Sequence, residues 1–135
     1  MAEPFPANAS ILLLCSDPLM RTILFEALER AGYVVVAVAD LGAAVDRLKE
    51  FRPDLLIVRP YINSMTGHMA SQYLRTRCPG LPVLVVGGFM DDQRVHDQNA
   101  IEDFYVFPKP FTRDELLDKV RDVMRAVHPQ PGPKP

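Results

Sequence analysis

The feature that most constrains the fold is a set of five short apolar runs separated by segments with helical spacing. The runs are residues 11–14, 33–38, 54–58, 82–86 and 104–107. A strand of a parallel sheet that is covered on both faces has no polar alternation, so short continuous apolar runs are typical of such strands. Strands that alternate with helices at short connections therefore predict an α/β domain with a five-stranded parallel sheet and helices on both faces.

The expected helix starts carry capping residues. Asp17 and Pro18 follow the first run, and Asp is a favoured N-cap while Pro suits the first helical turn, so a helix should begin there and end near Gly32. Asp40 should cap a second helix in the same way. Residues 112–115, with sequence TRDE, form a capping box that should open the last helix.

We expect a single domain over residues 10–127, preceded by an extension at 1–9 and followed by a proline-rich, disordered tail at 128–135. A long loop after the third strand should lead into a helix over about 68–77. Residues 91–102, where the fourth helix should lie, are nearly all polar. We therefore expect that helix to be short or mobile.

Composition and charge exclude several classes of protein. The 135 residues are 48% hydrophobic and carry a net charge of −2, which gives no electrostatic reason to expect a nucleic-acid partner. The two cysteines form no disulfide framework, which suits a reducing compartment. The N-terminus lacks the build of a secretory signal, and no apolar run approaches the roughly 20 residues of a membrane helix. We expect a soluble, cytoplasmic protein.

Ligands of open parallel α/β sheets bind at the carboxyl ends of the strands, so the residues at those ends are the candidate site. The predicted strand ends carry Cys15, Ser16, Asp17, Arg59, Gly87 and Lys109.

Four segments, taken in order, resemble the receiver domain of bacterial two-component response regulators. They are ILLLCSDPLMR, PDLLIVR with Gly67 eight positions beyond its arginine, PVLVV, and the terminal KPF. The resemblance covers about residues 11–126. It implies a flavodoxin-like, doubly wound sheet with strand order 2-1-3-4-5.

The resemblance also implies which site residues have been replaced. The family's acidic pair for Mg²⁺ falls on Cys15 and Ser16, and its phosphoacceptor aspartate falls on Arg59. The family's switch Ser/Thr falls on Gly87, and only the family's lysine is matched, by Lys109. The sequence therefore resembles a degenerate receiver, or pseudo-receiver.

Aspartyl phosphorylation needs a carboxylate nucleophile and a hard cation held by oxygen ligands. Arg59 has no carboxylate from which an acyl phosphate could form, and it stays cationic at any ordinary pH. Asp17 is the one carboxylate left in the cluster, and its Asp-Pro context favours a helix cap over a metal ligand. We therefore expect no metal or other cofactor, because the Mg²⁺ site should be lost.

Arg59 has two interpretations. The first is an internal ion pair with Asp17, or with Asp91 and Asp92 after the fourth strand, that replaces the metal as the neutralising charge. The second is an anion site in which Arg59 and Lys109 converge. We favour the ion pair.

The leading functional hypothesis is a stand-alone, non-enzymatic signalling module that binds a protein partner. The resemblance implies a histidine kinase, another receiver or an output protein as that partner, with a homodimer as a further possibility. It places the partner surface around the fourth helix, fifth strand and fifth helix, at Tyr105, Val106 and Phe111. No output domain is expected after the last helix.

Two other hypotheses belong to different classes. One is a sensor of a small anion or metabolite that uses Arg59 and Lys109. The other is an enzyme that uses Ser16 or Cys15, since Arg59 and a helix N-terminus could lower the pKa of the thiol. We rank the enzyme last because no histidine is expected near either nucleophile.

Overall fold

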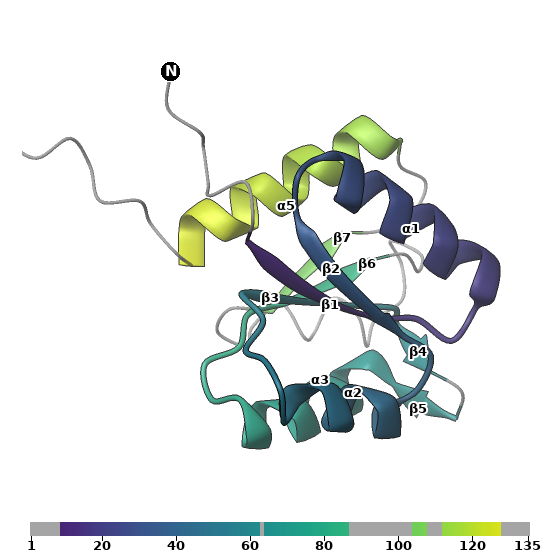
Figure 1. The fold of residues 1–135 in the computed structure, drawn as a ribbon, viewed down its shortest axis with the longest axis vertical. Coiled ribbons are helices and arrows are strands. Elements are labelled where there is room, and N and C mark those ends of the chain that lie inside the picture. The colour runs from purple at the N-terminus through teal and green to yellow at the C-terminus, as the bar shows by residue number, and fades with distance from the viewer. Residues whose placement is uncertain (1–8, 63, 87–103, 108–111, 128–135) are drawn as a thin grey trace, which may run out of the picture.

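The fold is an open parallel sheet with helices on both faces, as the alternating pattern predicts (Figure 1). The computed structural model describes residues 9–62, 64–86, 104–107 and 112–127. The sheet runs in the order β2-β1-β3-β6-β7, with every neighbouring pair parallel. Its strands are β1 (Ser10–Leu14), β2 (Val34–Val38), β3 (Leu55–Val58), β6 (Val83–Val86) and β7 (Phe104–Phe107). The predicted order 2-1-3-4-5 is confirmed, with β6 and β7 as its fourth and fifth strands.

Two pairs of helices sandwich this sheet. The described helices are α1 (Pro18–Arg30), α2 (Leu41–Leu48), α3 (Gly67–Arg77) and α5 (Arg113–Val127). Figure 1 shows α1 and α5 over one face of the sheet and α2 and α3 over the other. The weak helix expected over residues 91–102, the N-terminal residues 1–8 and the tail at 128–135 lie outside the described residues.

The central strands are buried on both faces, which accounts for their unbroken apolar runs. Ile11 and Leu13 of β1 belong to the core beneath α1 and α5, whereas Leu12 and Leu14 belong to the core shared with α2 and α3. All four side chains are fully buried. Because successive side chains of a strand point to opposite faces, one short apolar run supplies both cores.

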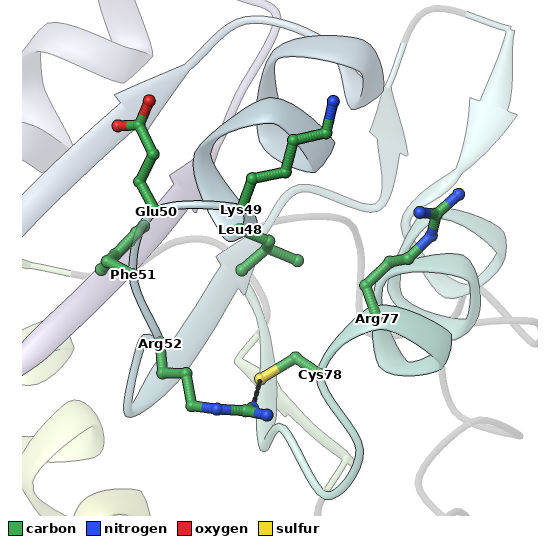
Figure 2. Close-up of a pocket in the computed structure, with 7 residues that line it drawn as sticks. All are labelled: Leu48, Lys49, Glu50, Phe51, Arg52, Arg77 and Cys78. Atoms are coloured by element: carbon green, nitrogen blue, oxygen red, sulfur yellow. Dashed lines mark hydrogen bonds between the residues drawn. The ribbon is translucent and has the colours of Figure 1, made fainter.

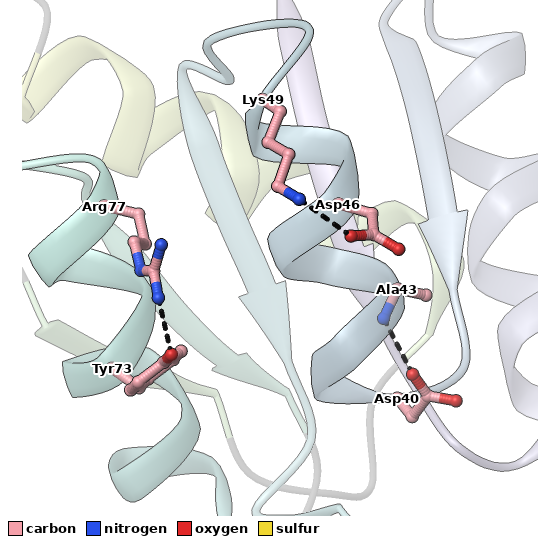
Figure 3. Close-up of polar contacts among 6 residues, drawn as sticks. All are labelled: Asp40, Ala43, Asp46, Lys49, Tyr73 and Arg77. Carbon is pink, nitrogen blue, oxygen red and sulfur yellow. Dashed lines mark hydrogen bonds and ion pairs between the residues drawn. The ribbon is translucent and has the colours of Figure 1, made fainter.

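The predicted caps form. Asp17 caps α1 by accepting a hydrogen bond from a backbone N–H of the first turn at 3.0 Å, and Asp40 caps α2 in the same way at 2.8 Å (Figure 3). At α5, Thr112 N donates to Glu115 Oε1 at 2.8 Å and Glu115 N donates to Thr112 Oγ1 at 3.1 Å. This reciprocal pair is the capping box expected from the sequence.

The loop after β3 contains a small antiparallel hairpin that the sequence does not predict. Its strands are β4 (Tyr61–Ile62) and β5 (Met65–Thr66). Strands of two residues are too short to show a period in the sequence. The hairpin returns the chain to the end of β3, where Gly67 N donates to Pro60 O at 2.6 Å and α3 begins.

Candidate functional site at the carboxyl ends of β1 and β3

Strand register brings Cys15 and Arg59 together. Leu14 of β1 pairs with Val58 of β3 in parallel, so the residues that follow them lie side by side at the carboxyl edge of the sheet. The β1 ladder continues one residue further, because Cys15 N donates to Val38 O at 3.0 Å. Side-chain alternation along β1 and β3 puts both residues on the face covered by α1 and α5.

Cys15 is a buried, neutral thiol. It is fully buried, and its Sγ donates to the carbonyl of Asp17 at 3.4 Å. Burial raises the pKa of the Cys15 thiol above its ordinary value, against the smaller lowering effects of the Asp17 backbone and the Arg59 charge. The expectation that Arg59 and the helix N-terminus could activate this thiol is therefore wrong, because desolvation has the larger effect.

Arg59 is half-buried and does not form the predicted ion pair with Asp17. Among the described residues, its buried Nη1 has no hydrogen-bond partner, and no ion pair involves Arg59. Asp17 is exposed, and its carboxylate accepts the capping hydrogen bond at the start of α1 instead. The other predicted partners, Asp91 and Asp92, lie outside the described residues.

Two further residues, Arg21 and Gly67, position the backbone of this site. Arg21 Nη1, from the first turns of α1, donates to the carbonyl of Cys15 at 2.8 Å. A Cβ at Gly67 would lie 2.2 Å from the carbonyl oxygen of Arg59, so only glycine lets α3 approach the end of β3 this closely. In the sequence, this contact is indicated only by the position of Gly67 eight residues beyond Arg59, which is part of the resemblance to the receiver family.

The remaining predicted site residues are placed only in part. Ser16 is half-buried and directly precedes the cap of α1. Tyr105 and Val106 lie in β7, paired with Leu84 and Val85 of β6. Gly87, Lys109 and Phe111 lie outside the described residues.

The described side chains at this edge do not fit Mg²⁺. The cation prefers several oxygen ligands with negative charge. Here the thiol of Cys15 stays protonated, the carboxylate of Asp17 caps a helix, and the guanidinium of Arg59 is cationic. Within the part of the chain that the structure describes, no group of three or more His, Cys, Asp or Glu residues could hold a metal ion.

None of the described helices is both long enough and apolar enough to span a bilayer.

Comparison with known proteins identifies the family. The family model for the response regulator receiver domain matches residues 11–121. The response regulator MprA from Mycobacterium sp. (strain KMS) is 32% identical over 124 residues, which are 91% of this chain and 54% of MprA. MprA from Mycobacterium bovis (strain BCG / Pasteur 1173P2) is 31% identical with the same coverage. The chain thus spans about half the length of these relatives.

Solved structures show the same fold. A response regulator receiver protein from Sinorhizobium medicae WSM419 has a TM-score of 0.75 at 22% identity, covering 90% of this chain and 98% of its own. The chemotaxis response regulator CheY4 of Vibrio cholerae has a TM-score of 0.76 at 23% identity, covering 86% and 98%. From the family match and the curated relatives together, this chain belongs to the response regulator receiver domain family of two-component signalling.

Proposed function

We propose that this chain is a receiver module that is not switched by aspartyl phosphorylation. The observation that carries the proposal is the position of Arg59, directly after β3 and beside Cys15 at the carboxyl edge of the sheet. The resemblance to the family implies that this position belongs to the phosphoacceptor aspartate. A guanidinium therefore occupies the place where the reaction needs a carboxylate.

The chemistry of the neighbouring residues supports this proposal. Phosphoryl transfer to a receiver needs an anionic oxygen to attack phosphorus and cations to offset the charge of the phosphoryl group. Arg59 has no nucleophilic oxygen, and Cys15 is a buried thiol whose raised pKa keeps it protonated. Cys15 and Ser16 stand in place of the acidic pair, and within the described residues no group of three or more His, Cys, Asp or Glu residues could hold a Mg²⁺ ion.

A series of variants tests the proposal. Each variant is incubated with a small-molecule phosphodonor and Mg²⁺, and its intact mass is measured. Arg59→Asp alone should stay unmodified, because Cys15 and Ser16 leave the metal without its acidic pair. The triple variant Cys15→Asp/Ser16→Asp/Arg59→Asp should gain a phosphoryl group that depends on Mg²⁺.

Arg52→Asp, at the other end of β3, is the matched control for the change of charge and should stay unmodified. Circular dichroism confirms that each variant is folded. Because Cys15→Asp puts a carboxylate in place of a buried thiol, Ser16→Asp/Arg59→Asp provides a second variant that keeps the core intact. Phosphorylation of Arg59→Asp alone would contradict the alignment of the first strand end.

We further propose that the module acts in the cytoplasm by binding a protein, and that it is not an enzyme. The candidate partners are a histidine kinase, another receiver, an output protein or a second copy of the chain. The proposed surface includes Tyr105, Val106 and Phe111. Tyr105→Ala should weaken capture of the partner, whereas Tyr73→Ala, which truncates an exposed tyrosine on α3, should not. Equal capture by both variants would contradict this surface.

A second candidate function is a small-anion or metabolite sensor at Arg59 and Lys109. The observation that favours it is the buried Arg59 Nη1, which has no hydrogen-bond partner in the described part of the chain and could donate to a bound anion. A titration with phosphate or an acidic metabolite, followed through the amide resonances of Arg59 and Lys109, tests it. Resonances that stay unchanged up to millimolar concentrations would remove this candidate.

A further inference from the structure

A pocket lies at the amino end of β3, at the opposite end of that strand from Arg59. It has a volume of about 300 Å³ and lies where the carboxyl ends of α2 and α3 meet the segment that leads into β3 (Figure 2). Its lining includes Lys49, Glu50, Arg52 and Arg77, together with the thiol of Cys78. A volume of about 300 Å³ is at the lower end of the range for small-molecule sites.

The pocket is lined by three cations and one carboxylate, although the whole chain has a net charge of −2. The carboxylate of Glu50 already accepts a hydrogen bond from Arg47 Nη1 at 3.3 Å. Lys49 Nζ lies 3.5 Å from Asp46 Oδ1, on the outer surface of α2 (Figure 3). The positive charge at this pocket is therefore only partly neutralised.

The two guanidinium groups have no carboxylate partner among the described residues. Arg52 Nη1 donates to Cys78 Sγ at 3.3 Å, and a thiol is a weak acceptor (Figure 2). Arg77 Nη2 donates to the Tyr73 hydroxyl at 2.7 Å, and the guanidinium lies 5.2 Å from the centre of the Tyr73 ring (Figure 3). Neither arginine takes part in an ion pair with a described residue. Both could bind an anion without breaking an existing ion pair.

Helix dipoles explain part of this arrangement. Arg77 lies in the last turn of α3 and Lys49 is the C-cap residue of α2, and cations stabilise helix carboxyl ends. Arg52 lies on no helix, so the dipole gives no reason for its position. Because helix-end electrostatics do not explain the position of Arg52, its presence in the same pocket favours a ligand site.

We propose that this pocket binds a small phosphate-bearing anion, of the phosphate monoester class. Guanidinium groups bind phosphate oxygens with two parallel hydrogen bonds, and a lysine ammonium adds a point charge. The three cationic groups point in different directions in Figure 2, so binding requires these exposed, flexible side chains to turn from their present contacts toward one tetrahedral group. The proposal is independent of the function proposed above, because it uses no residue of the carboxyl edge of the sheet.

Inorganic phosphate is the probe that tests this site. It is titrated into the full chain at constant ionic strength, with chloride as the reference anion, and amide resonances are followed. The wild-type protein should show saturable shifts at Phe51, Arg52 and Cys78. Arg52→Gln/Arg77→Gln should weaken the apparent affinity by at least about tenfold, because it removes both guanidinium groups.

The matched control is Arg30→Gln/Arg125→Gln. Both control residues are exposed and lie in the last turns of α1 and α5, so this variant also removes two positive charges from helix ends. Its phosphate affinity should equal that of the wild-type protein. Glu50→Gln should bind phosphate more tightly, because it removes the one negative charge of the pocket.

Three results would overturn the proposal. The first is shifts that grow linearly with phosphate, or that weaken equally in both double variants, because either result would indicate general charge screening. The second is shifts confined to the carboxyl ends of β1 and β3, which would place the anion at Arg59 instead. The third is co-sedimentation with phosphatidic acid vesicles but no saturable phosphate shift, which would indicate a lipid surface as the source of the phosphate.

Discussion

Replacing Gly67 by alanine should loosen the contact that places α3 against the end of β3. The added Cβ would lie 2.2 Å from the carbonyl oxygen of Arg59 and 3.2 Å from its carbonyl carbon. Ordinary contacts of a Cβ are 3.4–4 Å, so by this difference the helix start or the strand end must move by more than about 1 Å. Both neighbours are backbone, so no side-chain rotation relieves the overlap.

The expected cost follows from two opposing effects. Overpacking of a well-packed site costs about 1–3 kcal/mol. Replacing glycine with alanine restricts the unfolded chain and returns about 0.4–1 kcal/mol when the backbone conformation suits alanine. Gly67 is not among the described glycines with positive φ, so the penalty is steric. The net loss in free energy of unfolding should be about 1–2 kcal/mol. For a domain of this size, each kcal/mol lost should lower the melting temperature by about 3–5 °C.

Urea unfolding measures this effect, and Gly42→Ala is its control. At Gly42, in the first turn of α2, the nearest atom to an added Cβ is Asp40 Oδ1 at 3.5 Å, an ordinary contact. That variant should gain about 0.4–1 kcal/mol. The two substitutions should thus change the free energy of unfolding in opposite directions, while the dependence of that free energy on urea concentration stays unchanged. A Gly67→Ala variant as stable as the wild-type protein would refute the close approach to Arg59.

Three further outcomes are expected. Arg59→Met should raise the free energy of unfolding by about 1 kcal/mol, because it removes a buried donor that has no partner among the described residues. A lower urea midpoint would show that Arg59 has a stabilising partner. Burial raises the pKa of both Cys15 and Tyr33, so stability is fully present below their ordinary pKa values, 9.0 and 10.0, and falls as pH rises through the higher folded values. Cys15→Ala/Tyr33→Phe should flatten this alkaline decline, and an unchanged decline would disprove the assignment. Thr112→Ala should lower the free energy of unfolding, measured with urea, by about 1 kcal/mol, because the hydrogen bond from Glu115 N to Thr112 Oγ1 is lost. An unchanged free energy of unfolding would argue against the capping box.

The fold was predictable because its local signals agree with one another. The apolar run of β1 supplies two cores at once, and Asp17 and Asp40 mark helix starts by capping chemistry that acts over two or three residues. The β4–β5 hairpin was missed because two-residue strands carry no periodic pattern. Its existence depends on where α3 must begin, which is a tertiary requirement.

The site was predictable in its positions but not in its interactions. Parallel register places Cys15 beside Arg59, and that adjacency follows from the strand pattern. The direction of the Cys15 pKa shift depends on burial against nearby charge, and the sequence gives no measure of that balance. The predicted Asp17–Arg59 pair did not form because the same carboxylate caps α1. The pocket at the amino end of β3 joins Arg52 to Cys78, 26 positions further along the chain, and has no local signature in the sequence.

Intact mass spectrometry shows whether this receiver scaffold lacks the chemistry of aspartyl phosphorylation. The wild-type protein is incubated with a small-molecule phosphodonor and Mg²⁺, beside a receiver that carries aspartate at the position of Arg59. We predict an unchanged mass for this chain, whereas the reference receiver should gain a phosphoryl group. A gain of one phosphoryl group that hydroxylamine removes would reveal an acyl phosphate and show that this chain is phosphorylated like other receivers.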